Sequence, residues 1–201
     1  MTLLIDPPKE GRCFIISAPA GTGKTTLVNM LVKEFSFILA NISFTTRQPR
    51  QGEVDAKDYH FISKKNFEEK IVAEEFLEYV KLYDDYYGSS KTWVMDQKNQ
   101  GKFVILVIDT QGAIQLKGKL DAVYIFISPP SLDELRKRLS GRKTESPEKI
   151  EKRIEWASQE MQAIPYYDYL IINDDLLIAY EILKSIMIAE AHRIIKNSRN
   201  S

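Results

Sequence analysis

The stretch APAGTGKTT (residues 18–26) most limits what this chain can fold into. The apolar run CFII (residues 13–16) precedes it, and a second apolar run, LVNMLV (residues 27–32), follows it. A buried strand, a glycine-rich turn, a lysine, a hydroxyl residue and a helix are the parts of a phosphate-binding loop, in the right order. Lys24 would reach the outer phosphates, and the Thr25 hydroxyl would bind Mg²⁺. The stretch predicts a nucleoside triphosphate and leaves the phosphate acceptor open.

The first position of this loop departs from the usual pattern G-x-x-x-x-G-K-[ST], because Ala18 replaces its first glycine. Alanine fits there if its φ stays negative, and glycines remain where the turn is tightest. A glycine-rich turn with an incidental lysine is the alternative interpretation. The residues expected to bind the nucleotide are Ala18, Pro19, Ala20, Gly21, Thr22, Gly23, Lys24, Thr25 and Thr26.

Apolar, β-branched runs alternate with segments of helical period along the rest of the chain. We expect strands near residues 13–17, 76–82, 103–108, 123–128 and 169–172, and helices near residues 25–34, 65–75, 92–99, 132–139, 146–161 and 177–196. Residues 84–90 (DDYYGSS) are expected to form a turn, and Ser146 is expected to cap the helix that follows it. The alternation predicts an α/β fold with three layers and a central parallel sheet.

The composition excludes several classes of function. The 201 residues include 28 Lys plus Arg and 28 Asp plus Glu, so the net charge is zero and we expect neither nucleic acid nor a membrane as a partner. Cys13 is the only cysteine, and His60 and His192 are too few and too far apart to suggest zinc. The start of the chain does not resemble a signal peptide, and no apolar run approaches the roughly 18 residues of a membrane span. We expect one domain in a reducing, cytoplasmic compartment.

A second polar segment, SFTTRQPRQGE at residues 43–53, follows the loop. Arg47 and Arg50 lie beside its turn, and Tyr59 follows within DYHF at residues 58–61. Planar guanidinium groups and a phenol suit a phosphate monoester. From this segment alone, a solvated charged surface is an equally good interpretation.

This segment and several others resemble the guanylate kinases. The matching segments are SFTTRQPRQGE (43–53), DYHF (58–61), FLEY (76–79), YYGS (86–89), IDTQGA (108–113), FISPPSLDELRKRL (126–139), RIEWASQE (153–160) and YDYLIINDD (167–175). With the loop, they run in order over nearly the whole chain. The resemblance implies transfer of a phosphoryl group from ATP, with Mg²⁺, to GMP or dGMP, in purine nucleotide recycling.

The resemblance also implies how one domain, residues 1–201, is divided. The P-loop core would take residues 1–40, 94–134 and 155–201, a small GMP-binding subdomain residues 41–93, and a helical lid residues 135–154. Monomer and homo-oligomer both stay open.

Three sets of site residues follow from the resemblance. The residues expected to hold the GMP phosphate are Arg47, Arg50, Tyr59 and Tyr87, with Glu53 ordering the arginines. The residues expected to face or border the guanine are Ser43, Glu78, Gly88, Ser89 and Asp109. The residues expected to act on the transferred group are Lys24, Arg47, Arg138, Arg142 and Arg153, with Asn173 near the donor base or ribose.

The chemistry of guanine agrees with this assignment. Guanine presents N1–H and N2–H₂ donors and an O6 acceptor, whereas a carboxylate only accepts and a serine can donate. Glu78 and Ser89 therefore suit guanine, and adenine would turn its N1 lone pair toward the carboxylate. Without the resemblance, an outward-facing strand carboxylate at Glu78 and solvated arginines at the helix ends are the simpler interpretations.

The sequence departs from the family's pattern at three further positions. Val107 stands where the family commonly has the first aspartate of D-I-D-x-Q-G, so we assign Mg²⁺ to Thr25 and the phosphates. Ala56 and Ser89 replace a frequent glycine and threonine, and Ser89 keeps the hydroxyl. These changes leave the expected acceptor site intact.

Two other functions are weighed against a kinase that uses GMP. The same fold occurs as a non-catalytic, guanylate-kinase-like protein-binding module, but this chain keeps Lys24 and the arginines that such modules lose. A kinase for another phosphate monoester is the third interpretation, and Glu78 with Asp109 argues against it.

Overall fold

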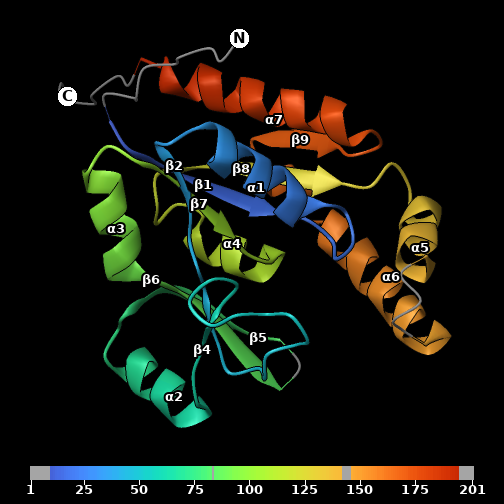
Figure 1. Cartoon of the computed structure of the whole chain (residues 1–201), viewed down its shortest axis with the longest axis horizontal. Helices are drawn as coiled ribbons and strands as arrows, with labels where there is room; N and C mark the ends of the chain where they lie inside the picture. Colours follow the sequence, from blue (N-terminus) through green and yellow to red (C-terminus); the bar gives the residue numbers. More distant parts are fainter. Residues whose placement is uncertain (1–9, 83, 142–145, 195–201) are drawn as a thin grey trace.

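The computed structural model describes residues 10–82, 84–141 and 146–194 (Figure 1). The strands are β1 (Arg12–Ser17), β2 (Ile38–Ala40), β3 (Phe44–Thr45), β4 (His60–Phe61), β5 (Phe76–Leu82), β6 (Asp85–Ser90), β7 (Phe103–Val107), β8 (Ala122–Ser128) and β9 (Tyr169–Ile172). The helices are α1 (Lys24–Glu34), α2 (Lys64–Val72), α3 (Lys91–Asn99), α4 (Thr110–Leu116), α5 (Leu132–Ser140), α6 (Pro147–Met161) and α7 (Leu176–Ala191), with a 3₁₀ turn, η1, at Ile164–Tyr166.

A parallel sheet with the strand order β2-β7-β1-β8-β9 forms the centre of the molecule. Side chains of β1 alternate between its two faces, as the pleat of a strand requires. Phe14 and Ile16 pack with residues of α1 and α7, whereas Cys13 and Ile15 pack with residues of α3 and α4. Figure 1 shows these helix layers on opposite faces of the sheet. The expected three-layer α/β fold with a central parallel sheet is confirmed.

A second sheet, with the order β4-β3-β6-β5, lies below the central sheet in Figure 1; the chain enters it after β2 and leaves it from β6 into α3. Strands β5 and β6 form an antiparallel hairpin, and β3 pairs antiparallel with β6 and parallel with β4. Helix α2 covers this sheet through Phe67, whose ring stacks on Phe76 at 4.4 Å and on Tyr86 at 5.1 Å. The two sheets thus supply separate supports for the loop and the segment at residues 43–53.

The turn expected at residues 84–90 is wrong, because residues 85–90 form β6. Pairing with β5 sets this strand, with Val80 opposite Tyr87 and Glu78 opposite Ser89. The helix expected at residues 65–75 ends at Val72. Glu74 has a φ of 53°, a left-handed conformation that cannot continue a right-handed helix.

Three further expectations need correction. Helix α7 ends at Ala191, and the N–H of His192 closes its last turn on Ala189 and Glu190; residues 195 and 196 lie outside the described residues. Ser146 occupies the N-cap of α6, but its side chain makes no capping hydrogen bond. The short elements β2, β3, β4 and α4 were not expected, because such short segments show no clear periodicity.

Candidate active site

The loop between β1 and α1 has the backbone that its sequence requires. Gly21 and Gly23 have φ values of 94° and 87°, which L-residues rarely adopt. Ala18 is buried and is not among the described residues with positive φ, so the condition for an alanine at the first position is met. The Thr22 hydroxyl donates a hydrogen bond to the Pro19 carbonyl at 2.8 Å and tightens the turn.

The loop ends at the N-terminus of α1, which is open to an anion. Gly23 is the N-cap and no side chain caps the helix, so the first N–H groups have no partner within it. These groups and the helix dipole favour a phosphate at this end. Thr25 and Thr26 are exposed in the first turn. The Lys24 ammonium donates to the Ala18 carbonyl at 3.2 Å, and burial lowers its pKa while Glu160 and Asp109 oppose that shift.

Asn173 supports the loop from the end of β9. Its side chain is buried, and its Nδ2 donates to the Thr22 carbonyl at 2.5 Å. A Cβ atom on Gly23 would lie 2.7 Å from the same Nδ2. The close approach of loop and strand therefore depends on the glycine.

Arg47, Arg50 and Glu53 form one unit after β3. Glu53 accepts hydrogen bonds from Nη1 and Nη2 of Arg47, both at 2.9 Å, and from the backbone N–H of Arg50 at 2.7 Å. The Arg47 guanidinium holds the pKa of Glu53 below its usual value, and Glu53 raises the pKa of Arg47. The bidentate pair fixes the plane of the guanidinium.

Two tyrosines stand beside this unit. The rings of Tyr59 and Tyr87 lie edge to face with centroids 6.0 Å apart, and Arg47 Cζ lies 5.4 Å from the Tyr59 centroid. Burial raises the pKa of Tyr59, so its phenol keeps its proton and can donate a hydrogen bond at neutral pH.

A cavity of about 220 Å³ joins the loop to the second sheet. It is lined by Lys24, Ser43, Tyr59, Glu78, Val80, Leu82, Tyr87, Gly88, Val107, Ile108 and Asp109. The structure therefore brings together the loop lysine, both tyrosines and the two carboxylates that the sequence singled out.

Glu78 lies on β5 at the wall of this cavity and is 4% exposed. Burial raises its pKa to about 7; the Ser89 hydroxyl, which donates to Oε1 at 2.7 Å, opposes the shift, and Asp109 adds to it. Ser89 is fully buried behind Glu78 and does not line the cavity. It therefore contacts the carboxylate, rather than facing the cavity as expected.

Asp109 is the N-cap of α4 at the end of β7. Its Oδ1 accepts the N–H of Gly112 at 2.8 Å, which fixes the side chain. Its Oδ2 is buried and has no hydrogen-bond partner among the described residues. Burial raises its pKa. A buried carboxylate oxygen that lacks a donor is suited to a ligand that brings one.

The expected arginines of α5 and α6 lie on the other side of the loop. Arg138 donates to the carbonyls of Asn173 at 2.8 Å and Asp174 at 3.2 Å, so it reaches the segment that supports the loop. Arg153 is half-buried on α6, and Arg142 lies outside the described residues. The two helices share a small apolar core of Leu135, Leu139, Ile150, Ile154 and Ala157.

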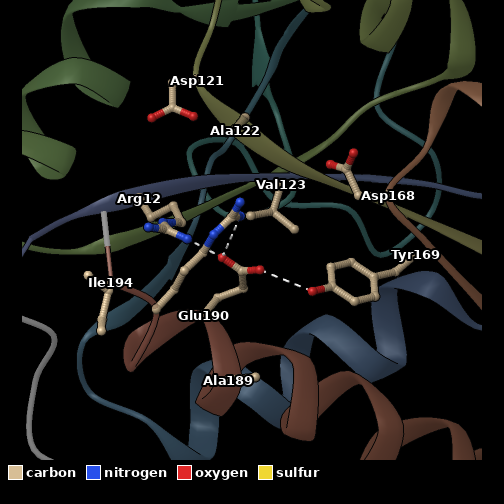
Figure 2. A pocket seen from close by; sticks show the side chains of 10 residues that line it. Arg12, Asp121, Ala122, Val123, Asp168, Tyr169, Ala189, Glu190 and Ile194 are labelled. Carbon is tan, nitrogen blue, oxygen red and sulfur yellow. Dashed lines mark hydrogen bonds and ion pairs between the residues drawn. The ribbon is translucent and has the colours of Figure 1, made fainter. Parts of the chain in front are cut away.

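A larger cavity, of about 1060 Å³, lies at the opposite, amino-terminal ends of β1, β8 and β9 (Figure 2). Its centre is the Glu190 carboxylate, which forms an ion pair with Arg12 and accepts the Tyr169 hydroxyl at 3.0 Å. These polar groups satisfy one another, and none of the expected site residues lines this cavity.

Comparison with known proteins agrees with the geometry. The guanylate kinase family matches residues 10–190. The chain belongs to the guanylate kinase family. It is 62% identical to the guanylate kinase of Protochlamydia amoebophila over 96% of this chain and 98% of that protein, and 46% identical to that of Chlamydia trachomatis serovar D over 91% and 90%. The crystal structure of guanylate kinase from Anaplasma phagocytophilum superposes with a TM-score of 0.77 at 30% identity, covering 92% of this chain and 88% of that one.

In this guanylate kinase family member, Val107 puts an apolar side chain on the cavity wall near Asp109. Among the described residues, no group of three or more His, Cys, Asp or Glu side chains could hold a metal ion. Over the same residues, the structure has no helix long and apolar enough to cross a bilayer.

Three residues of this site were missed in the sequence. Glu160, on α6, is buried, and burial raises its pKa to about 7, with Lys24 opposing the shift. Gly112 lies against Glu78, and Asn41 donates hydrogen bonds to two serines. Glu160 and Gly112 fall within matching segments, whereas nothing in the sequence marks Asn41.

Proposed function

We propose that this chain transfers the γ-phosphoryl group of ATP to GMP, giving ADP and GDP, in the recycling of purine nucleotides. Membership of the guanylate kinase family supports the reaction. The observation that carries the choice of acceptor is the cavity in which Glu78 and Asp109 face the same space as Lys24. One site thus combines acceptors for a base with a cation for the transferred phosphoryl group.

The base-binding end of the site selects guanine. Ionised Glu78 and Asp109 only accept hydrogen bonds, and the N1–H and N2–H₂ groups of guanine supply the donors. Adenine would leave a carboxylate facing the N1 lone pair. A buried site that hydrogen-bonds its substrate can reject an analogue without those groups by roughly 10⁴–10⁵. The deoxyribose of dGMP leaves this edge unchanged, so dGMP is a second acceptor.

Arg47, Arg50, Tyr59 and Tyr87 hold the phosphate of GMP. The Arg47–Glu53 pair supports this assignment, because a guanidinium fixed in plane loses little entropy when it binds a phosphate. The Tyr59 phenol, which keeps its proton, donates to a phosphate oxygen. Arg47 and Arg50 together with Glu53 carry one net positive charge, which partly offsets the charge of the incoming monoester.

The loop at residues 18–26 binds the triphosphate of ATP. Asn173 holds this loop through its hydrogen bond to the Thr22 carbonyl. The exposed Thr25 hydroxyl is a hard oxygen ligand that fits Mg²⁺ together with phosphate oxygens. When bound, Mg²⁺ neutralises charge on the phosphates. Lys24 stabilises the charge on the transferred group from the cavity side.

We assign residues 41–93 to a GMP-binding part and residues 135–154 to a lid on the core. A separate sheet supports the first assignment, and the small core shared by α5 and α6 supports the second. Arg138 and Arg153, with Arg142 outside the described residues, serve the transferred group from the lid. Phosphoryl transfer gains little from covalent chemistry, so alignment and charge stabilisation account for most of the catalysis.

A coupled assay tests this function by offering GMP, AMP, UMP and dTMP in turn with ATP and Mg²⁺. We expect ADP formation with GMP and little with the others. Lys24→Ala should lower kcat by at least roughly 10² and so exclude a contaminating kinase. A pure, folded protein that forms no ADP with GMP would refute the proposal and favour the non-catalytic protein-binding module.

A further inference from the structure

Asn41 joins the central sheet to the guanine end of the cavity. Its backbone N–H donates to the Ile105 carbonyl at 2.8 Å, which anchors it to β7 directly after β2. Its side-chain Nδ2 donates to Ser89 Oγ at 3.1 Å and to Ser43 Oγ at 3.3 Å. One amide therefore contacts two serines, Ser43 directly before β3 and Ser89 on β6.

The direction of these hydrogen bonds follows from counting protons. A hydroxyl carries one proton, and when Glu78 is ionised the Ser89 hydroxyl donates it to Glu78 Oε1 at 2.7 Å. Ser89 Oγ can then only accept from Asn41, so the amide nitrogen, and not the amide oxygen, must face it. The second hydrogen of the same nitrogen points to Ser43.

Ser43 differs from Ser89 in where its own proton can go. Its Oγ accepts from Asn41, and Ser43 lines the cavity, whereas Asn41 and Ser89 do not. The Ser43 proton therefore remains free to point into the cavity. A base bound there meets a donor at Ser43 and acceptors at Glu78 and Asp109.

We infer that Asn41 is a positioning residue for guanine recognition: its amide makes Ser43 a hydrogen-bond donor toward O6 of the base and makes Ser89 a donor toward Glu78. The inference rests on the proposed use of GMP. Guanine O6 accepts a hydrogen bond at the position where adenine carries an N6–H₂ donor. The direction set by Asn41 therefore contributes to the choice between the two purines without direct contact with either.

Asn41→Asp tests this inference, because a carboxylate only accepts and forces both serines to donate to it. Ser43 would then present a lone pair to O6, and Ser89 would turn its proton away from Glu78. We expect kcat/KM for GMP to fall roughly 10- to 100-fold, mostly through KM, with the KM for ATP unchanged. Asn29→Asp, the same change on the exposed face of α1, should leave both constants unchanged.

The path through Ser43 is tested by a double-mutant cycle and by 6-thio-GMP, whose sulfur is a weaker acceptor than O6. In a Ser43→Ala background, Asn41→Asp should cost several-fold less than it does alone. The preference for GMP over 6-thio-GMP should also shrink in Asn41→Asp. The inference would be overturned if Asn41→Asp lowered kcat/KM for GMP by the same factor in wild type and in Ser43→Ala. It would also be overturned if Asn41→Asp left the preference for GMP over 6-thio-GMP unchanged.

A purely structural role of Asn41 would change stability and the KM values in a different pattern. If Asn41 only joined the two sheets, its variants would lower the melting temperature and affect the KM values for GMP and ATP together. Should Asn41→Asp fail to fold, Asn41→Ala frees both hydroxyls to rotate and should give a smaller, GMP-specific loss; no such loss would overturn the inference. Wild-type protein without GMP-dependent ADP formation would refute the proposed function itself.

Discussion

Gly112 lies so close to Glu78 that a Cβ atom on Gly112 would be 2.7 Å from Glu78 Oε2. The two residues come from α4 and β5, and the same glycine donates its N–H to Asp109. Gly112 thus limits the space around Glu78 and Asp109, the two carboxylates proposed to bind the base.

Gly112→Ala should therefore displace the Glu78 carboxylate from its position in the cavity. We expect kcat/KM for GMP to fall by about tenfold or more, because the new methyl group would push the carboxylate out of the position in which it is proposed to meet the base. The KM for ATP, whose proposed site is the loop at residues 18–26, is the internal control. Equal losses for the two substrates would contradict this local effect.

The ionisation of Glu78 should make GMP binding depend on pH. Its pKa in the folded protein is raised to about 7, and the proposed contact with GMP requires the ionised form. Between about pH 8 and about pH 6 the ionised fraction falls about tenfold, so the KM for GMP should rise by about that factor. Glu78→Gln, which does not titrate, should bind GMP weakly but without this rise; the ionisation of the GMP phosphate affects both proteins alike.

The same pKa gives a stability test in the absence of nucleotide. Between about pH 4.5 and about pH 7 the folded protein keeps a proton on Glu78 that the unfolded chain has released, so stability falls as pH rises through this window. Glu160 titrates in both proteins, so the difference between wild type and Glu78→Gln isolates Glu78. Thermal melts that run parallel over this range would contradict the raised pKa.

The sequence was sufficient to predict every strand of the central sheet except β2, because strands such as Phe103–Val107 are unbroken apolar runs. It was not sufficient for β3 and β4, which have two residues each and exist only through their partners. Strand β6 was mistaken for a turn because its polar, glycine-containing sequence is typical of loops, whereas its pairing with β5 is a tertiary effect.

The residues of the candidate site also divide into those that the sequence could predict and those that it could not. Arg47, Glu53 and Glu78 lie in segments that resemble a known family, so their candidacy could be read directly from the sequence. The contact of Asn41 with Ser89 depends on how β2 leads into the second sheet, and the approach of Glu160 to Lys24 depends on the path of α6. Neither pairing has a signal in the linear sequence, because the motifs mark Lys24 and Ser89 singly and do not indicate which side chains meet them.

The Arg47–Glu53 pair should matter for GMP rather than for folding. Glu53→Gln removes one charged partner of a partly buried bidentate pair, so Arg47 and the Arg50 backbone lose their common anchor. We expect the KM for GMP to rise by about tenfold with a smaller change in kcat. Steady-state kinetics measures this, and Glu69→Gln, which changes an exposed glutamate 3.9 Å from Lys65, is the matched control. A similar change in both variants would point to a general charge effect.

Exchange of glycine and alanine should lower kcat at Gly23 but not at Ala18. Gly23→Ala places a Cβ 2.7 Å from Asn173 Nδ2 at a φ of 87°, so it should lower both the melting temperature and kcat. Ala18→Gly only removes a buried methyl group and frees the unfolded chain, so it should cost about 1 kcal/mol of stability and leave kcat near that of wild type. Urea denaturation and kinetics on both variants measure these effects. A several-fold rise in kcat for Ala18→Gly would contradict this expectation. It would mean that the methyl group hinders the loop and that residue 18 needs a φ that alanine does not readily adopt.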